Sequence, residues 1–397
     1  MKKLTRLLKR VINKNYSSII KEKIKGRIIS SILAPDYMKE KRYRLELVEQ
    51  GFENRKNDVI DDVIFERIIA SYNKAKSIQL KSESIYQVSN EWLPIYESYM
   101  NEIIQALTSP SIDKVSSIYN NFFRESCSVG LHGLPVDMFK HYFEGKINLE
   151  DRKLFLDDFI HRIKIWETSL GHSFNIKQLD SPIIGNPYGY SIDDTFIKAG
   201  ADYLHYYATM ISRLVRGNGH KFVLELGAGY GGLPYYLIRD NSDITYLDFD
   251  LPENMALTAF YLLSAFPEKK IALYGEIDLI TANLEEYDIV LMPNFEISKI
   301  QKDSIDLVFN SYSLAEMSLE TIDNYLSHFN RIAKKFIFHV NHTKYSVVKA
   351  DDFKIDLNKF ELMYRAPALW NMVRKIDMDE FEYLYKNKQY TFISMDA

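Results

Sequence analysis

The stretch VLELGAGYGG, Val223–Gly232, decides the fold because an apolar run carrying one acid, Glu225, ends there in four closely spaced glycines. Glycine allows a backbone to turn sharply and lets a ligand approach the main chain closely. The first, second and fourth glycines fit the spacing GxGxxG, whereas Glu225 and the first three glycines fit ExGxGxG. The stretch therefore predicts a strand, a ligand-binding turn and the start of a helix.

Short apolar runs alternate with helical stretches on both sides of this turn. The strand-length runs are KFVLEL, DITYLDFD, DIVLMP, IDLVFN and KFIFHV, and the helical stretches between them are GGLPYYLIRD, PENMALTAFYLLSAF and SLETIDNYLSHFNRIAKK. Such alternation predicts an α/β fold with a parallel sheet covered on both faces. A helix at about Asp194–Leu214 is expected before the first strand, and QYTFISM near the carboxyl terminus is expected to add a last strand.

The chain upstream of this region has a different texture. From about Tyr37 to Leu170 the apolar residues recur at helical spacing, and Ser181–Asp194 then holds two prolines and two glycines, which is typical of a boundary. We therefore expect a helical domain over residues 1–180 and an α/β domain over residues 181–397. The helical domain is expected to form a wall of the acceptor site or a homodimer contact, and the sequence does not separate these roles.

Composition narrows the classes of partner. The chain has 397 residues and a net charge of −4, so no basic field indicates a nucleic-acid partner. Its one cysteine, Cys127, excludes an internal disulfide and a cysteine-based zinc site, and is expected to be an inert thiol in a reducing compartment, the cytoplasm.

The basic first residues leave two interpretations open. Within residues 1–15, leucines at helical spacing would lie on the side of a helix opposite to the lysines and arginines. Polar residues interrupt every apolar run, so neither a membrane span nor a secretory signal is predicted. The segment is either an ordinary leading helix or a peripheral contact with an anionic membrane surface.

Glu225 discriminates between the ligands of the two glycine spacings. A dinucleotide brings a pyrophosphate to the turn, which a nearby carboxylate would repel, whereas S-adenosylmethionine (SAM) carries an ammonium and a sulfonium group that a carboxylate attracts. An acid at the end of the next strand, Asp248 or Asp250, serves the ribose of either ligand. The spacing and Glu225 together favour SAM over a nicotinamide cofactor.

Four segments in order carry a closer resemblance: LELGAGYGGLPYYLI, DLPENMALTAFYLLSAFP, NSYSLAEMS and HVNHT. Over most of Ser181–Thr343 the chain resembles the bacterial sugar O-methyltransferase family. The resemblance implies the Rossmann-like fold of class I SAM-dependent methyltransferases, with methyl transfer to a hydroxyl of a sugar or glycan precursor for surface polysaccharide. It places the cofactor on Glu225, Gly227, Gly229, Gly231 and Asp250.

Four further positions complete the expected cofactor site. Ala228 lies within the turn, and Asp248 lies two residues before Asp250 on the same strand face. Asn294 follows the third strand and either reaches the adenine or serves as a turn residue. Asn310, at the tip of the fourth strand, is also assigned to the cofactor. Tyr188, Tyr190, Tyr203 and Tyr206 either form a lid or pack as ordinary core.

Methyl transfer to a hydroxyl needs a base, because the hydroxyl proton is lost only far above neutral pH. We expect His342, just past the fifth strand, to be that base, although a strand-end hydrogen bond is an equal alternative. Glu316 either orients His342, accepts the proton itself, or caps the helix that begins near Ser318. His339 lies within an apolar run and is expected to be a core residue.

Several alternatives stay open at this stage. Glu316, Asn341 and His342 could assemble a magnesium or manganese site, but no dense ligand motif accompanies them, so no metal is expected. The acceptor could be another small molecule. A nicotinamide oxidoreductase is disfavoured by Glu225, and a non-catalytic scaffold docked to a membrane would leave the intact glycine turn without a purpose.

Overall fold

The computed structural model describes residues 40, 42–53, 60–88, 92–109, 111–131, 148–171, 175–369 and 378–391. The basic segment at residues 1–15, for which we expected a leading helix or a membrane contact, lies outside these ranges. Within them, no helix is both long and apolar enough to cross a membrane.

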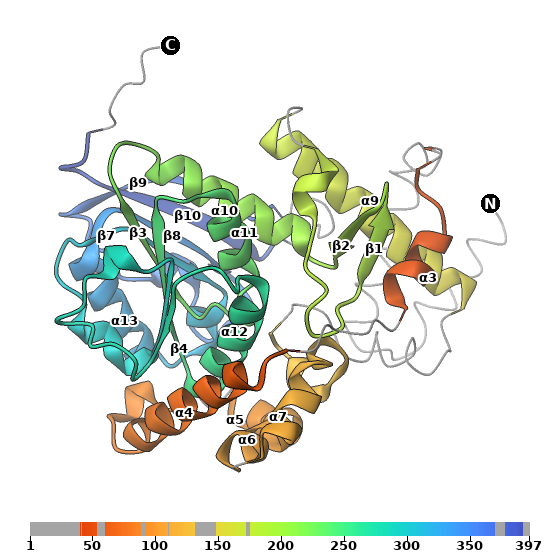
Figure 1. Ribbon diagram of the computed structural model, residues 1–397. Helices are drawn as coiled ribbons and strands as arrows, with labels where there is room; N and C mark the ends of the chain where they lie inside the picture. The colour runs from red at the N-terminus through yellow and green to blue at the C-terminus, as the bar shows by residue number, and fades with distance from the viewer. Residues whose placement is uncertain are drawn as a thin grey trace, which may run out of the picture.

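The α/β part is built on a large sheet (Figure 1), which has eight strands in the order β5-β6-β4-β3-β7-β8-β10-β9. Its strands are β3 Lys221–Leu226, β4 Ile244–Asp250, β5 Ile271–Leu273, β6 Ile289–Pro293, β7 Ile305–Ser311, β8 Ala333–His342, β9 Phe360–Pro367 and β10 Glu380–Asn387. The strands from β5 to β8 in this order are parallel, and β10 is antiparallel to both of its neighbours. This order, with an antiparallel strand inserted near one edge, confirms the Rossmann-like fold of class I methyltransferases.

Helices cover both faces of the sheet, and alternating strand residues separate the two cores. Val223 and Leu307 share one core with α10 Ala201–Val215, α11 Gly232–Asp240 and α12 Pro252–Ala265. Leu224 and Val308, the next residues on the same strands, share the other core with α13 Leu319–Ile332. Because strand side chains alternate between faces, every central strand is buried on both sides.

The described residues of the amino-terminal part are mainly helical, as predicted. Its helices are α3 Glu46–Phe52, α4 Asp62–Gln79, α5 Trp92–Ile95, the π-helix η3 Tyr96–Met100, α6 Asn101–Thr108, α7 Ile112–Tyr119 and α9 Leu149–Leu170. Short 3₁₀ helices along the chain are η2 Ser84–Tyr86, η4 Phe122–Arg124, η5 Ser126–Ser128, η6 Ile176–Leu179, η7 Leu284–Glu286, η8 Asn294–Lys299, η9 Ser313–Glu316 and η10 Ala350–Asp352.

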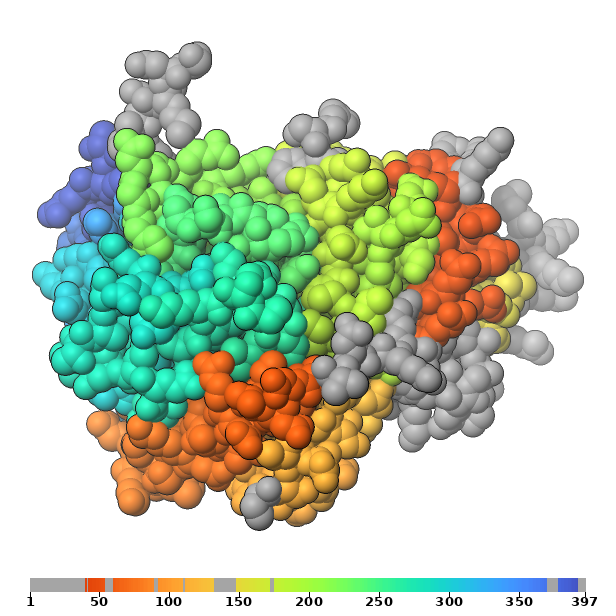
Figure 2. Space-filling model, in the orientation of Figure 1, coloured from red at the N-terminus to blue at the C-terminus, as the bar shows by residue number. Residues whose placement is uncertain are grey.

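These helices lie directly against the α/β part rather than apart from it. The orange residues of α4 meet the teal residues of the α/β part in Figure 2, and Lys76 of α4 pairs with Glu253 of α12 at 2.7 Å. One hydrophobic core cluster runs from Tyr43 in the first described segment to Leu384 in β10. The domain boundary near residue 180 stays a prediction, since the two parts share this core.

One element near the domain boundary begins later than expected. The helix expected from Asp194 begins only at Ala201, because the strands β1 Gly189–Ile192 and β2 Thr195–Lys198 form a hairpin there. Its two turn residues, Asp193 and Asp194, have φ of 47° and 61°, which aspartate tolerates better than most residues and which suits a tight hairpin.

The carboxyl-terminal strand also differs from the expectation. The last described strand is β10, which ends at Asn387, and the first residues of the expected strand QYTFISM follow it as a turn. Residues 392–397 lie outside the described ranges. The sequence pattern also missed β9, because FELMYRAP does not alternate between apolar and polar residues and four of its eight residues are exposed.

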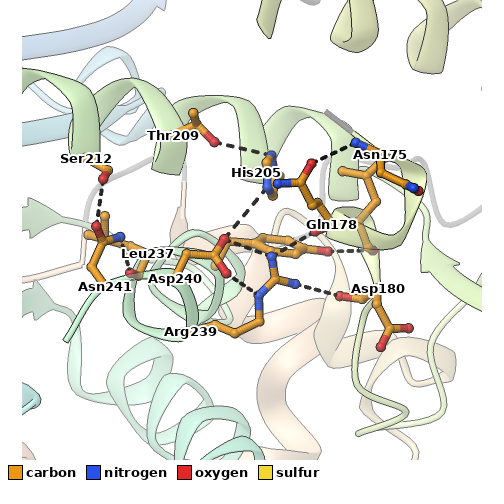
Figure 3. A network of polar contacts seen from close by, with 12 residues as sticks. Asn175, Gln178, Asp180, His205, Thr209, Ser212, Leu237, Arg239, Asp240 and Asn241 are labelled. Carbon is orange, nitrogen blue, oxygen red and sulfur yellow. Dashed lines mark hydrogen bonds and ion pairs between the residues drawn. The ribbon is translucent and has the colours of Figure 1, made fainter. Parts of the chain in front are cut away.

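A polar network joins the segment around residue 180 to α10 and α11 (Figure 3). Arg239 of α11 donates to the carbonyl oxygens of Gln178 at 2.8 Å and Asp180 at 3.2 Å, and it pairs with Asp240. His205 lies beside this group, and burial lowers its pKa to about 4, so the ring is neutral and accepts a hydrogen bond from Trp166. The network is structural and holds α10 and α11 in place.

Candidate active site

The glycine turn lies at the carboxyl end of β3, where the strand order reverses and ligands of such sheets bind. Gly227, Gly229 and Gly231 have φ of 85°, 64° and 92°, a region that other residues rarely adopt. A Cβ at Gly227 would lie 2.7 Å from Ser313 Oγ, and one at Gly229 would lie 3.3 Å from the carbonyl oxygen of Leu131. The turn therefore requires glycine for its backbone and for its close neighbours.

Three buried carboxylates lie beside this turn. Glu225 accepts a hydrogen bond from the Tyr246 hydroxyl, and Asp248 Oδ1 accepts one from the backbone N–H of Ala228 at 3.2 Å. Asp250 Oδ1 accepts from the backbone N–H of Leu251 and from the side chain of Asn254. The second oxygens of Asp248 and Asp250 are buried, and the described residues offer them no hydrogen-bond partner.

The electrostatics of these acids point to a cationic, hydroxyl-bearing ligand. Burial raises the pKa of Glu225 to about 8 and that of Asp250 to about 7, and burial with repulsion from Asp250 and Glu225 raises the pKa of Asp248 well above its usual value. Buried acids of like charge are costly unless positive charge and hydrogen-bond donors compensate them. The second oxygens of Asp248 and Asp250 can accept hydrogen bonds from such donors.

The two asparagines assigned to the cofactor have different surroundings. Asn294, the first residue of η8, donates to the Tyr86 carbonyl and to the Tyr325 hydroxyl at 2.9 Å, while its own buried carbonyl oxygen has no partner among the described residues. Asn310 donates to the Leu226 carbonyl at 2.9 Å and accepts from Asn341 at 3.0 Å. Asn310 thus joins the tips of β3, β7 and β8, and its contact with a cofactor stays a prediction.

His342, the expected base, lies at the end of β8 beside a carboxylate that the sequence did not reveal. Its Nδ1 lies 2.7 Å from Oδ2 of Asp379, which is 1% exposed. The other oxygen, Oδ1, accepts from the backbone N–H groups of Thr343, Lys344 and Tyr345. Burial alone would raise the pKa of Asp379, but the hydrogen bonds from His342 and the backbone outweigh it and lower that pKa. Asp379 therefore holds the ring as a fixed anion.

Tyr312, at the tip of β7, packs against this pair. Its ring centroid lies 5.4 Å from that of His342, and its hydroxyl donates to Glu380. Its φ is 66°, an unusual backbone angle for a bulky residue, and such strain concentrates at functional sites. Next to it, the hydroxyls of Tyr203 and Ser311 are 2.7 Å apart.

Two of the roles expected for Glu316 are filled by other residues. Glu316 Oε2 accepts a hydrogen bond from Trp92 Nε1 at 2.6 Å. Asp379, not Glu316, contacts the His342 ring, and Ser318 caps α13 by accepting from the backbone N–H of Thr321. The expectation of a cap at Glu316 was therefore wrong, because the serine hydroxyl lies closer to the free N–H groups of the first turn. Its role as a proton acceptor stays a prediction.

The remaining expectations fall on core residues. His339 is fully buried and stacks on Tyr383, and burial lowers its pKa to about 3, which confirms a core histidine. Cys127 is buried, and burial raises its pKa to about 12, as expected for an inert thiol. Tyr188, Tyr190 and Tyr206 are also buried and serve as packing residues.

The metal site that the sequence left open does not assemble from the three residues considered. The Asn341 side chain donates a hydrogen bond to Asn310 and accepts one from the backbone N–H of Ala315. Glu316 accepts a hydrogen bond from Trp92. Within the described residues a different group, His342, Asp379 and Glu380, has ligand atoms within 4.8 Å of one another. Both oxygens of Asp379 already accept hydrogen bonds there, so a cation would have to displace the His342 contact.

A scan against protein-family models found no match, and neither did a search of the curated proteins. Among solved structures, a TehB-like SAM-dependent methyltransferase from Corynebacterium glutamicum is 15% identical, and the match covers 47% of this chain and 88% of that one with a TM-score of 0.32. Magnesium protoporphyrin IX methyltransferase from Synechocystis is 13% identical over 47% and 77%, with a TM-score of 0.31.

The N-methyltransferase NodS from Bradyrhizobium japonicum, in complex with S-adenosylhomocysteine, is 10% identical over 46% of this chain and 86% of its own, with a TM-score of 0.32. At this level of similarity the fold assignment rests on the strand order of this chain. The likeness to the sugar O-methyltransferase family is not confirmed by these structures.

Proposed function

We propose that this protein is a SAM-dependent methyltransferase that methylates a hydroxyl of a sugar or glycan precursor, for surface polysaccharide. The observation that carries the proposal is the glycine turn with three buried carboxylates beside it, two of which have a buried oxygen with no hydrogen-bond partner among the described residues. SAM offers ribose hydroxyls and positive charge that favours the ionised form of these acids, whereas the pyrophosphate of a dinucleotide would disfavour their ionisation.

The hydrogen-bond acceptors at the carboxyl edge of the sheet fit SAM. The unpaired oxygens of Asp248 and Asp250 suit the ribose hydroxyls, and Glu225 lies at the end of β3 where a positive group is attracted. The carbonyl oxygen of Asn294, which has no hydrogen-bond partner in the described part of the chain, suits the adenine amino group. When bound, SAM supplies an activated methyl group on a positively charged sulfur.

On the acceptor side, we assign His342 as the base. Asp379 accepts the Nδ1 proton, which leaves Nε2 of the ring with a lone pair for the acceptor hydroxyl. During methyl transfer to the acceptor oxygen, the hydroxyl proton would pass to Nε2 of His342, and S-adenosylhomocysteine would be the leaving group. Tyr312 packs on the ring, so the imidazole keeps one orientation during the transfer.

The sugar acceptor and the cellular setting rest on the sequence resemblance. The acceptor would be a nucleotide sugar, a lipid-linked glycan or a polymer in the cytoplasm, with the basic segment at residues 1–15 as a peripheral contact to the inner face of the membrane. Sedimentation with anionic vesicles tests that contact: if removal of residues 1–15 leaves vesicle binding unchanged, the contact is ruled out.

Calorimetric titration with S-adenosylhomocysteine and, in parallel, with NAD tests the cofactor. We expect micromolar binding of the former only, abolished by Gly229→Arg because that side chain would enter the turn next to Leu131. Transfer of labelled methyl from SAM to a panel of nucleotide sugars then tests the acceptor. A rate that survives EDTA would exclude a required divalent cation, and binding of NAD alone would refute the proposal.

A further inference from the structure

Lys198, the last residue of β2, is a buried cation with few partners among the described residues. It is 5% exposed, and within those residues its ammonium donates one hydrogen bond, to the carbonyl oxygen of Ala199 at 2.8 Å. An ammonium group has three N–H donors, and no carboxylate of the described residues lies within ion-pairing distance of this one. Because burial of an unpaired charge is costly, such a group is expected to meet an anion.

The position of Lys198 follows from the direction of the neighbouring helix. α10 begins at Ala201, three residues after Lys198, and a short connection joins its end to β3, so α10 runs opposite to β3. Its first turn therefore lies at the carboxyl edge of the sheet, where the glycine turn is. The hydrogen bond between Tyr203 in that first turn and Ser311 at the tip of β7 agrees with this placement.

Aromatic rings hold the ammonium group next to a side chain of the glycine turn. Lys198 Nζ lies 4.6 Å from the ring centroid of Tyr230, which is the residue between Gly229 and Gly231, and 4.9 Å from that of Phe123. Cation–π contacts attract the ammonium group without using its N–H donors. Asp202, in the first turn of α10, is the carboxylate that attracts it electrostatically.

The two sides of the turn thus carry opposite charges. Glu225, Asp248 and Asp250 lie at the ends of β3 and β4, while Lys198 lies on the side of α10. A ligand that carries positive groups and a carboxylate at once complements this arrangement, and an amino-acid moiety is such a ligand. Burial lowers the pKa of Lys198 to about 7, against the attraction of Asp202, so a bound anion would restore its charge.

We propose that Lys198 binds the α-carboxylate of the methionine moiety of SAM. This inference rests on the function proposed above, and it assigns to the chain the cation that the glycine motif lacks. The same carboxylate chemistry could come from an acidic sugar acceptor, but Tyr230 belongs to the cofactor turn and the acceptor pair His342–Asp379 lies with β8 and β10.

The test compares SAM with decarboxylated SAM, which keeps the sulfonium and the amine and lacks only the carboxylate. By calorimetry the wild-type protein should bind SAM about tenfold more tightly, the size expected for one charge-assisted hydrogen bond. Lys198→Met should lose that preference by weakening SAM alone. Equal affinity of the wild type for both ligands, or a preference that survives in the variant, would overturn the proposal.

Lys221→Met is the matched control. Lys221 is also a buried lysine, but its ammonium pairs with Asp243 at the opposite edge of the sheet, so the variant should keep the full preference for SAM. Thermal unfolding shows whether each variant is folded, and the wild-type comparison alone decides the proposal if Lys198→Met does not fold. If the wild type binds neither ligand, the proposed function fails instead.

The acidic-acceptor source has its own outcome. UDP-glucuronate and UDP-glucose, titrated in the presence of S-adenosylhomocysteine, differ by one carboxylate in the sugar. If Lys198→Met removed a preference between these two and left the SAM preference intact, the lysine would serve the acceptor and the assignment to the cofactor would be wrong.

Discussion

The strand tips form two groups, a cofactor half at β3 and β4 and an acceptor half at β7, β8 and β10, and these are built in different ways. Glu225, Asp248 and Asp250 lie in one strand–turn–helix–strand unit around the glycine turn. On the acceptor side, His342 contacts Asp379, which is 37 residues away in sequence, and Glu316 contacts Trp92, which is 224 residues away. The first half is therefore a local motif, and the second exists only once the sheet and the amino-terminal helices have come together.

The insertion of β10 into the sheet explains how His342 and Asp379 come together. β10 enters between β8 and β9, and its antiparallel register places Glu380 opposite His342. Asp379, one residue earlier, then reaches both the His342 ring and the backbone after β8. A local motif resists disruption elsewhere in the chain, whereas a pair made by register depends on the whole edge of the sheet. The predictions below test this difference.

The largest effect is expected at Gly227 in the cofactor half. Gly227→Val puts a branched side chain at a φ of 85° and within contact of Ser313, so binding of S-adenosylhomocysteine should be lost. Gly219→Ala is the control, since Gly219 has a φ of 79° with no atom near its Cβ position, and calorimetry should find unchanged binding there. Retained binding in Gly227→Val would show that the turn does not contact the cofactor.

In the acceptor half, His342→Ala should lower kcat by at least about 100-fold, the usual contribution of a general base, with the affinity for S-adenosylhomocysteine unchanged. Steady-state kinetics with the acceptor found in the methyl-transfer screen, together with calorimetry, gives both quantities. A loss of no more than about tenfold, within the range below a general base, would show that His342 is a strand-end residue.

Asp379→Asn should lower kcat by about tenfold or more, and by less than His342→Ala, because the amide can still contact the ring but can also donate to it and hold the wrong tautomer. The acceptor KM and the cofactor affinity should stay constant, which a general loss of structure would not allow. Asp306→Asn is the matched control: Asp306 is a buried acid that pairs with Lys335 and accepts from the backbone of Phe222. Equal losses in both variants would make Asp379 a purely structural residue.

The smallest effect concerns pH and the acids of the cofactor half. The pKa of Asp250 is about 7 and that of Glu225 about 8, both raised by burial, so each acid stabilises the ligand-free protein below its unfolded pKa and loses that contribution as pH rises through 7 and 8. Unfolding temperature should therefore fall between pH 6 and pH 9, and SAM should reduce the fall by adding positive charge.

Decarboxylated SAM isolates this acid effect, because it lacks the partner proposed for Lys198. Its affinity should rise by about tenfold from pH 6 to pH 8 as the acids ionise. Calorimetry across this range measures it. A flat profile would mean that these carboxylates are ionised before the ligand arrives.

The succession of strands and helices along the α/β part was predicted from the sequence with few errors, whereas the cofactor contacts of the expected site residues stay a prediction. Strand-length apolar runs and helical stretches alternate in phase with the observed β3, β4, β6, β7 and β8, and the acids of the turn lie where the motif placed them. The β1–β2 hairpin was missed because its two-aspartate turn lies inside a glycine- and proline-rich stretch that resembles a loop. β9 was missed because its exposed side chains carry no clear alternation.

By itself, the sequence determined the class of fold, the turn and the sign of the charge beside it, because hydrophobic periodicity and glycine spacing act over short distances. Only the tertiary structure decided which residue contacts the His342 ring, which one accepts the hydrogen bond from Trp92, and which buried cation contacts Tyr230 of the turn. Those contacts depend on the register of β10, the direction of α10 and the packing of the amino-terminal helices. No local pattern encodes them, because each joins segments that meet only after long-range packing.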